Sequence, residues 1–118
     1  MTRKILINKE YGGFGLSDTA IETYLIRSNI PYEKKERQVA SLLLDKMFFF
    51  TVNGKNFGDR DIPRDDLVLI KIAEEMGLEA IASKYCELKI VEIPADVQWE
   101  IMEYDGLEWV AEKHRTWQ

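Results

Sequence analysis

The sequence has 118 residues, 46% of them hydrophobic, and this length fits a single domain (residues 1–118) with an apolar core. Its 21 acidic and 16 basic residues give a net charge of −5, which argues against a nucleic-acid polymer as partner because such binding needs a broad basic surface. Apolar runs such as 47–50 are too short to cross a bilayer, so we expect no membrane partner. The single cysteine, Cys86, excludes an internal disulfide and is typical of a reducing compartment.

The first part of the chain predicts a strand followed by a helix. Residues 3–8 are predicted to form the strand, and Ser17 or Asp18 can cap a helix that runs to about residue 28. The chain then leaves the helix at 29–31, where Pro31 stops it. The side chains expected to face inward are Ile5, Ile7, Ile21, Tyr24 and Leu25.

Residues 32–46 carry no clear periodicity, and the charged run 34–37 is typical of a solvated surface. Residues 47–52 are predicted to form a strand, closed by the turn signal Asn53-Gly54 and a short return strand at 55–57. Asp65 or Asp66 can cap a second helix, which Gly77 ends. Its inward positions at helical spacing are Leu69, Ile72, Ala73 and Met76.

The last part of the chain predicts a strand at 88–93 and then a β-hairpin. Asp105-Gly106 is a strong two-residue turn between the strands 97–104 and 107–112. Such a turn pairs Tyr104 with Leu107, Met102 with Trp109, and Ile101 with Val110. Both faces of this hairpin are then substantially apolar, so we expect one to cover the core and the other to meet a second subunit or a ligand. A homo-oligomer is the simplest solution.

These elements predict an α+β fold in which an antiparallel sheet carries about two helices on one face. Between the first strand and the first helix lies the glycine loop, Tyr11-Gly12-Gly13-Phe14-Gly15. Glycines let backbone amides approach an anion at a helix N-terminus, and the two aromatic rings can stack on a base. The alternative is a tight turn that needs positive φ angles. Neither a Walker motif nor a dinucleotide-binding fingerprint is present.

The C-terminal cluster of His114, Arg115 and Trp117 combines phosphate-binding cations with an indole that can stack on a base. The alternative is a frayed terminus. Arg60 lies in a segment dense in both charges, 59–66, which could clamp a ligand; the alternative is a self-paired loop that caps the next helix.

Catalytic and metal sites are not predicted. His114 is the only histidine, so a small hydrolase that uses it is the weakest hypothesis. Cys86 lies in an apolar stretch and is expected to pack in the core. One histidine and one cysteine do not supply a metal site, and no cofactor is expected.

Several long segments resemble a widespread family of small bacteriophage proteins. The resemblance covers the first twenty residues and most of 59–117, but not about 30–50. It rests on Ile7-Asn8-Lys9, residues 11–14, Leu16-Ser17, residues 88–94 (LKIVEIP), and the segment from Trp99 through Tyr104-Asp105-Gly106 to residues 114–117 (HRTW). One departure is Leu67, where the family pattern would have a proline at the start of the second helix.

This family is identified with the viral sponges that counter bacterial CBASS immunity. The resemblance implies a non-enzymatic oligomer in the cytoplasm of the infected bacterial host, which binds cyclic dinucleotides such as 3′3′-cGAMP without cleaving them. The chemistry of the side chains then places the nucleotide beside Tyr11, Gly12, Gly13, Phe14, Arg60, His114, Arg115 and Trp117. The alternative function is a protein–protein inhibitor of a host enzyme that uses the apolar hairpin face around Met102 and Trp109.

Overall fold

Three small antiparallel sheets and three α-helices form the part of the chain that the computed structural model describes, which is every residue except 12, 39–45, 84–85 and 114–118. The strands are β1 (Thr2–Asn8), β2 (Glu33–Gln38), β3 (Lys46–Val52), β4 (Lys55–Phe57), β5 (Leu88–Pro94), β6 (Trp99–Tyr104) and β7 (Leu107–Glu112). The helices are α1 (Asp18–Arg27), α2 (Leu67–Met76), α3 (Leu78–Ile81) and the short 3-10 helix η1 (Asp59–Asp61).

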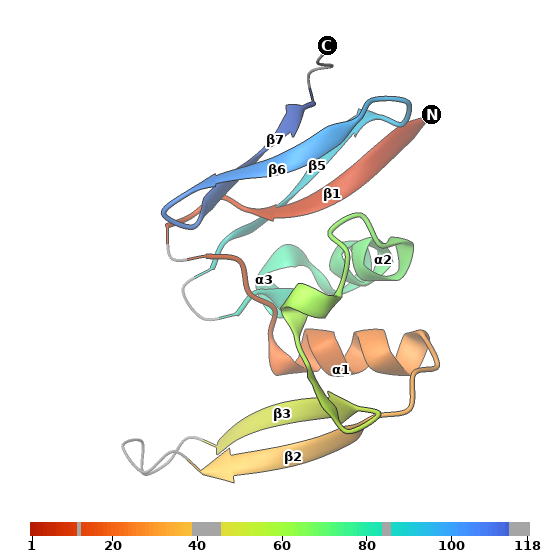
Figure 1. The fold of residues 1–118 in the computed structure, drawn as a ribbon, viewed down its shortest axis with the longest axis vertical. Coiled ribbons are helices and arrows are strands. Elements are labelled where there is room, and N and C mark those ends of the chain that lie inside the picture. The colour runs from red at the N-terminus through yellow and green to blue at the C-terminus, as the bar shows by residue number, and fades with distance from the viewer. Residues whose placement is uncertain (12, 39–45, 84–85, 114–118) are drawn as a thin grey trace, which may run out of the picture.

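The helices lie in a layer between two groups of strands (Figure 1). Strand β1 pairs with β5, and β6 with β7, at one end of the molecule, while β2, β3 and β4 form the sheet at the other end. The main core joins these layers through Leu6 of β1, Leu25 of α1, Ile72 of α2 and Phe50 of β3. The predicted α+β class is confirmed, with the strands divided among separate sheets and the helices between them.

Both long helices begin and end as their local sequence dictates. Ser17 caps α1 by accepting a hydrogen bond from the amide of Ala20, and Asp66 caps α2 by accepting from the amides of Val68 and Leu69. Gly77 ends α2 with a φ of 93°, a conformation that glycine adopts without a steric penalty. All the predicted inward residues of α1 are buried, and Met76 is the one half-buried member of the predicted set on α2.

The two predicted hairpins are confirmed, including their turns. Asn53-Gly54 and Asp105-Gly106 all have positive φ, as a type I′ turn requires. The pairing of β6 with β7 follows the predicted register, with Met102 opposite Trp109 and Tyr104 opposite Leu107. The charged run 34–37 belongs to strand β2, which the sequence did not indicate, and Lys34, Lys35 and Glu36 are exposed there as expected.

The β1–β5 sheet is apolar on both faces. Leu6 belongs to the main core, whereas the alternate residues Ile5 and Ile7 point to the other face. These two isoleucines are 0% and 4% exposed although they lie outside the main core, because the β6–β7 hairpin covers that face (Figure 1). The hairpin therefore builds a second, smaller core above β1 and β5.

Candidate functional site

The glycine loop lies at the C-terminal end of β1 and is tied into the fold on several sides. Gly15 accepts a backbone hydrogen bond from Ser83, and the amide of Leu16 donates to the Asp59 side chain. Gly13 has a φ of 101°, so the tight-turn interpretation applies there. Tyr11 is 59% exposed, which leaves its ring accessible, whereas Gly12 lies outside the described residues.

One face of the Phe14 ring is covered, because the guanidinium of Arg64 lies 3.4 Å from the centre of the ring. The same guanidinium donates to both carboxylate oxygens of Glu108, at 2.7 and 2.8 Å, and to the carbonyl of Leu6 at 3.2 Å. The side chains of Arg64 and Glu108 are 21% and 8% exposed. We name the set of Asn8, Phe14, Arg64 and Glu108 the Arg64 cluster. Its contacts join β1, the glycine loop and β7, so it stabilises the fold.

Asn8 connects the glycine loop with the turn of the β6–β7 hairpin. Its side-chain amide donates to the carbonyls of Glu10 and Gly106, and its side-chain oxygen accepts from the amides of Glu10 and Glu87. Its backbone amide donates to Glu108 at 2.8 Å. This buried asparagine therefore fixes the start of the glycine loop against the beginning of β7.

Arg60 is exposed in η1, but the acidic residues around it serve the fold. Asp61 accepts from the amide of Gly58, Asp59 holds Leu16 and Asp66 caps α2. The structure thus uses these carboxylates as caps, in line with the alternative interpretation of the segment 59–66. Arg60 itself has no ion pair with another described residue.

The predicted ligands His114, Arg115 and Trp117 lie outside the described residues. The residue before them, Lys113, lies beside Arg3, because both line one hollow on the surface. Strand β7 therefore starts beside Asn8 and runs back toward the N-terminal end of β1. At about 3.3 Å per residue, the length of β1 separates Lys113 from the glycine loop by roughly 20 Å. The described residues therefore place the glycine loop and Lys113 at opposite ends of β1.

Two adjoining hollows meet at Arg3, and we name them together the Arg3 groove. One has a volume of about 360 Å³ and the other about 750 Å³, which falls within the range of about 300–1,000 Å³ usual for ligand pockets. The smaller is lined by the β5–β6 connection, Trp99 and Lys113, and the larger by the start of β1 and one side of α2. Arg3 and Ala95 belong to both.

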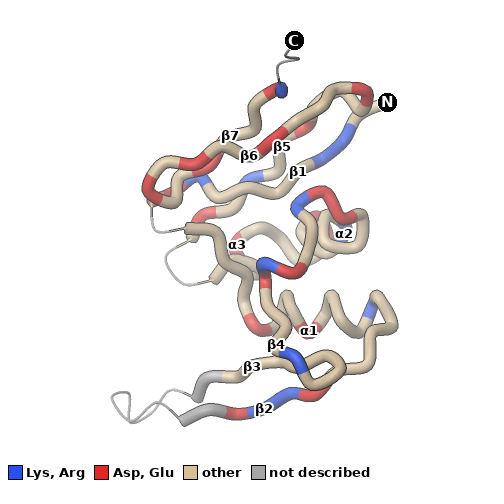
Figure 2. Tube along the Cα trace, viewed as in Figure 1, with Lys and Arg blue, Asp and Glu red and all other residues tan. Residues whose placement is uncertain are grey.

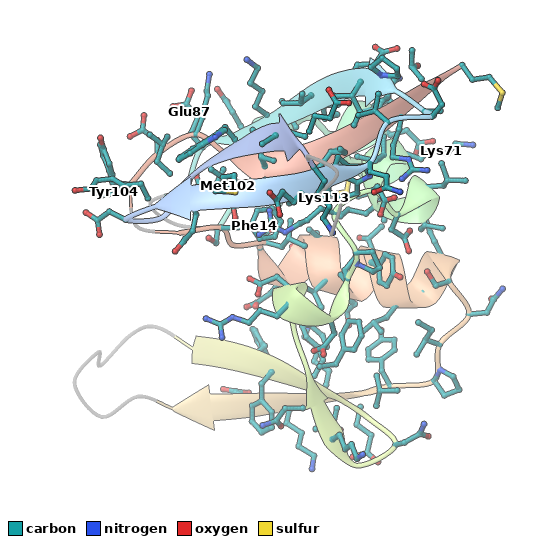
Figure 3. The ribbon with its side chains drawn as sticks, turned by 45° about the horizontal axis from the view of Figure 1, so that its top comes forward. Phe14, Lys71, Glu87, Met102, Tyr104 and Lys113 are labelled. Carbon is teal, nitrogen blue, oxygen red and sulfur yellow. The ribbon has the colours of Figure 1, made fainter. Side chains whose placement is uncertain are left out.

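Four cationic residues and one tryptophan line the Arg3 groove. Arg3 is loosely paired with Asp65 at 3.7 Å, and Lys4 contacts Glu74 at 2.8 Å. Lys71 and Lys113 have no ion pair with any other described residue. Figure 3 shows Lys71 on α2 and Lys113 after β7, both far from Tyr104 at the hairpin turn. Trp99 is half-buried at the edge of the smaller hollow.

Sequence reasoning missed the Arg3 groove, although part of the signal was available. The register of the Asp105-Gly106 hairpin places Trp99 opposite Glu112 and hence next to Lys113. What the sequence does not show is that β1 starts beside this point, since that contact joins segments about a hundred residues apart. Arg3 and Lys71 were therefore not assigned.

Cys86 is half-buried against the main core, in agreement with its expected packing role. Burial raises the pKa of its thiol, and the thiol donates to the side-chain oxygen of Asn8 at 3.5 Å. Among the residues described here, no group of three or more histidine, cysteine or acidic side chains could hold a metal ion. Likewise, none of the described helices has the length and apolar character needed to cross a membrane.

Comparison with known proteins finds no family model, curated protein or solved structure that matches this chain. The resemblance to small bacteriophage proteins therefore stays a prediction from the sequence motifs.

Proposed function

We propose that this protein binds a cyclic dinucleotide, such as 3′3′-cGAMP, in the Arg3 groove and sequesters it without cleaving it. The observation that carries the proposal is the meeting of two ligand-sized hollows at one loosely held arginine. Beside it are Trp99 and two lysines, Lys71 and Lys113, that form no ion pair with another described residue. The motif resemblance to phage sponge proteins supports the same ligand class. On this proposal the protein acts in immune evasion, in the cytoplasm of the infected bacterial host.

Each part of the groove has a chemical role in this proposal. Arg3 donates to phosphate oxygens in a forked geometry, and Lys71 and Lys113 add charge on its two sides. The Trp99 indole provides a stacking surface for a base. The mixed charge of the groove, which also contains Asp65, favours a small anion with polar edges over a polyanion.

The sequence predicted that the nucleotide lies beside Phe14 and the glycine loop, whereas this proposal places it in the Arg3 groove. Tyr11, Gly13 and Arg60 do not line the Arg3 groove. The C-terminal residues His114 and Arg115 follow Lys113 directly in the sequence, and their contact with the ligand stays a prediction from their chemistry.

Thermal unfolding against a panel of cyclic di- and trinucleotides tests the proposal. A bound ligand at a hundredfold excess over its Kd should stabilise the protein by about 2.7 kcal/mol. Lys71→Glu and Lys113→Glu should each weaken binding about tenfold or more, because each removes a charge-assisted contact worth about 1.5–3 kcal/mol. Lys55→Glu makes the same charge change at the exposed first residue of β4, in the β2–β3–β4 sheet at the other end of the molecule, and should leave Kd unchanged.

The fate of the ligand separates sequestration from catalysis. After heat denaturation of the complex, chromatography should recover the cyclic dinucleotide intact. Recovery of linear or hydrolysed product would favour an enzyme, and the absence of any stabilisation across the panel would remove the nucleotide proposal. Light scattering of the same samples measures whether the expected homo-oligomer forms.

A further inference from the structure

The outer face of the β6–β7 hairpin exposes large apolar side chains that the fold does not use. We name it the outer hairpin face; its members are Glu100, Met102, Tyr104, Leu107, Trp109 and Ala111. Met102 is 41% exposed, Tyr104 70% and Trp109 45% (Figure 3). Ile101 and Val110, on the opposite face of the same strands, are half-buried over β1 and β5. The core is thus covered without the outer residues.

The hairpin is acidic as well as apolar. Every charged residue of β6, its turn and β7 is a glutamate or an aspartate, and Figure 2 shows this concentration along the two strands. Glu108 is neutralised by Arg64. The remaining carboxylates are exposed and form no ion pair with another described residue: Glu100, Glu103, Asp105 and Glu112. Glu100 lies on the outer hairpin face and Asp105 in the turn beside it, whereas Glu103 and Glu112 lie on the opposite face of the strands.

This charge pattern selects among the possible occupants of the face. Two copies joined face to face would bury Glu100 and Asp105 with no Lys or Arg on either copy's outer hairpin face to pair with them, which is destabilising. Nucleic acid and anionic lipid surfaces are repelled by the same carboxylates. A protein surface with an apolar socket and a rim of Lys and Arg satisfies both properties, because interfaces commonly combine a central aromatic anchor with complementary charges at the edge.

We propose that the outer hairpin face docks a partner protein through Trp109, Tyr104 and Met102, with Glu100 and the turn residue Asp105 facing basic residues of that partner. This surface is separate from the Arg3 groove, whose lining includes none of these residues. The proposal is independent of nucleotide binding, and only the choice of bacteria as the source of the partner rests on the proposed function.

Site-specific photo-crosslinking in host bacteria tests this proposal with the full-length chain. A photoreactive amino acid at position 102 should form an adduct with one host protein, and the same amino acid at the exposed position of Lys89, on β5, should not. The crosslinked peptide of the partner should contain Lys or Arg. A covalent dimer of this chain, a lipid adduct, or the absence of any adduct specific to position 102 would overturn the proposal.

Binding of the purified partner then tests the two physical components. Trp109→Ala should raise Kd about tenfold or more, as expected for a central aromatic anchor. Glu100→Lys should weaken binding, and the affinity of the unmodified pair should fall with added salt. Glu79→Lys, an equal charge change on the exposed side of α3, should leave Kd unchanged. Equal effects of Glu100→Lys and Glu79→Lys would contradict the proposed basic rim. Circular dichroism on each variant checks that the fold is retained.

Discussion

The two ends of strand β1 hold the same kinds of side chain under different constraints. At the Asn8 end, Arg64 is 21% exposed and donates to both oxygens of Glu108. At the opposite end, Arg3 is 40% exposed and lies 3.7 Å from the nearest oxygen of Asp65. A guanidinium whose donors are already satisfied by protein atoms stabilises the fold, whereas a loosely paired one can exchange its partner for a ligand at small cost.

The aromatic residues follow the same division. Phe14 has one ring face covered by Arg64, so it contributes to the Arg64 cluster. Trp99 lies at the edge of a hollow beside Arg3 and Lys113. The comparison therefore supports a structural role for the Asn8 end of β1 and agrees with the proposed ligand binding at the Arg3 end. Substitutions at the Asn8 end can test the structural role.

Glu108→Ala should have the largest effect on stability. The substitution leaves the guanidinium of Arg64 partly buried without its counter-ion and removes the acceptor for the amide of Asn8. Breaking a buried ion pair in this way costs about 3–5 kcal/mol, which urea unfolding would measure. Glu112→Ala, on the same strand but exposed, should change the free energy of unfolding by less than about 0.5 kcal/mol.

A double-mutant cycle with Arg64→Ala measures the coupling between the two side chains. The double variant should recover part of the loss, because no unpaired charge is then left in the cluster. A loss of unfolding free energy below about 1 kcal/mol for Glu108→Ala would match that of an exposed ion pair. The Arg64 cluster would then stabilise the fold no more than the exposed charges at the Arg3 end do.

Gly15→Ala should have an intermediate effect, since it disturbs the glycine loop through packing alone. A Cβ at this position would lie 2.2 Å from the Oγ of Ser83 and 3.0 Å from its Cβ, so the two segments must move apart. Overpacking of this kind costs about 1–3 kcal/mol. Gly58→Ala is the matched control, because a Cβ there meets no atom within 4 Å and the φ of −147° suits any residue.

Rescue identifies the cause of the Gly15→Ala effect. Ser83→Gly removes both clashing atoms. In that background, Gly15→Ala should lower the free energy of unfolding by much less than it does in the unmodified protein. If the penalty persisted in the double variant, the glycine would be needed for another reason than its contact with Ser83.

Local sequence signals predicted most of the secondary structure. The caps Ser17 and Asp66 and the turns Asn53-Gly54 and Asp105-Gly106 depend on residues within a few positions of each other, so they can be recognised without the fold. Strand β2 was missed because its charged residues show no apolar alternation; it forms by pairing with the phenylalanines of β3.

The positions of distant segments relative to one another could not be predicted from the sequence, for a physical reason. Phe14 was predicted to stack on a base, and nothing near it in the chain indicates that Arg64, fifty positions later, covers one face of its ring. The sequence left open whether the C-terminal cluster and the glycine loop form one site, and the direction of β7 along β1 places Lys113, the last described residue, at the other end of β1. Both relations depend on contacts between distant segments, which periodicity and spacing do not encode.

Lys9→Gln should have the smallest effect and tests an exposed ion pair at the Asn8 end. Lys9 contacts Glu87 at 3.1 Å, and its hydrogen bond and charge lower the pKa of Glu87 below the ordinary value of about 4.3. The stabilisation that follows from this lowered pKa is present above the unfolded-state pKa and is lost as the pH falls through the folded-state value. Because both side chains are about half exposed, we expect stability at neutral pH to be nearly unchanged.

The measurable consequence of Lys9→Gln is the pKa of Glu87 itself. A carboxyl NMR titration should show this pKa rising toward its ordinary value in the variant, whereas Lys89→Gln, an exposed lysine on the adjoining strand, should leave it closer to that of the unmodified protein. An unchanged pKa in Lys9→Gln would show that the ion pair does not persist in solution. In that case the order at the Asn8 end would come from the buried Arg64 cluster alone, and exposed charges at either end of β1 would be equally free to meet a ligand.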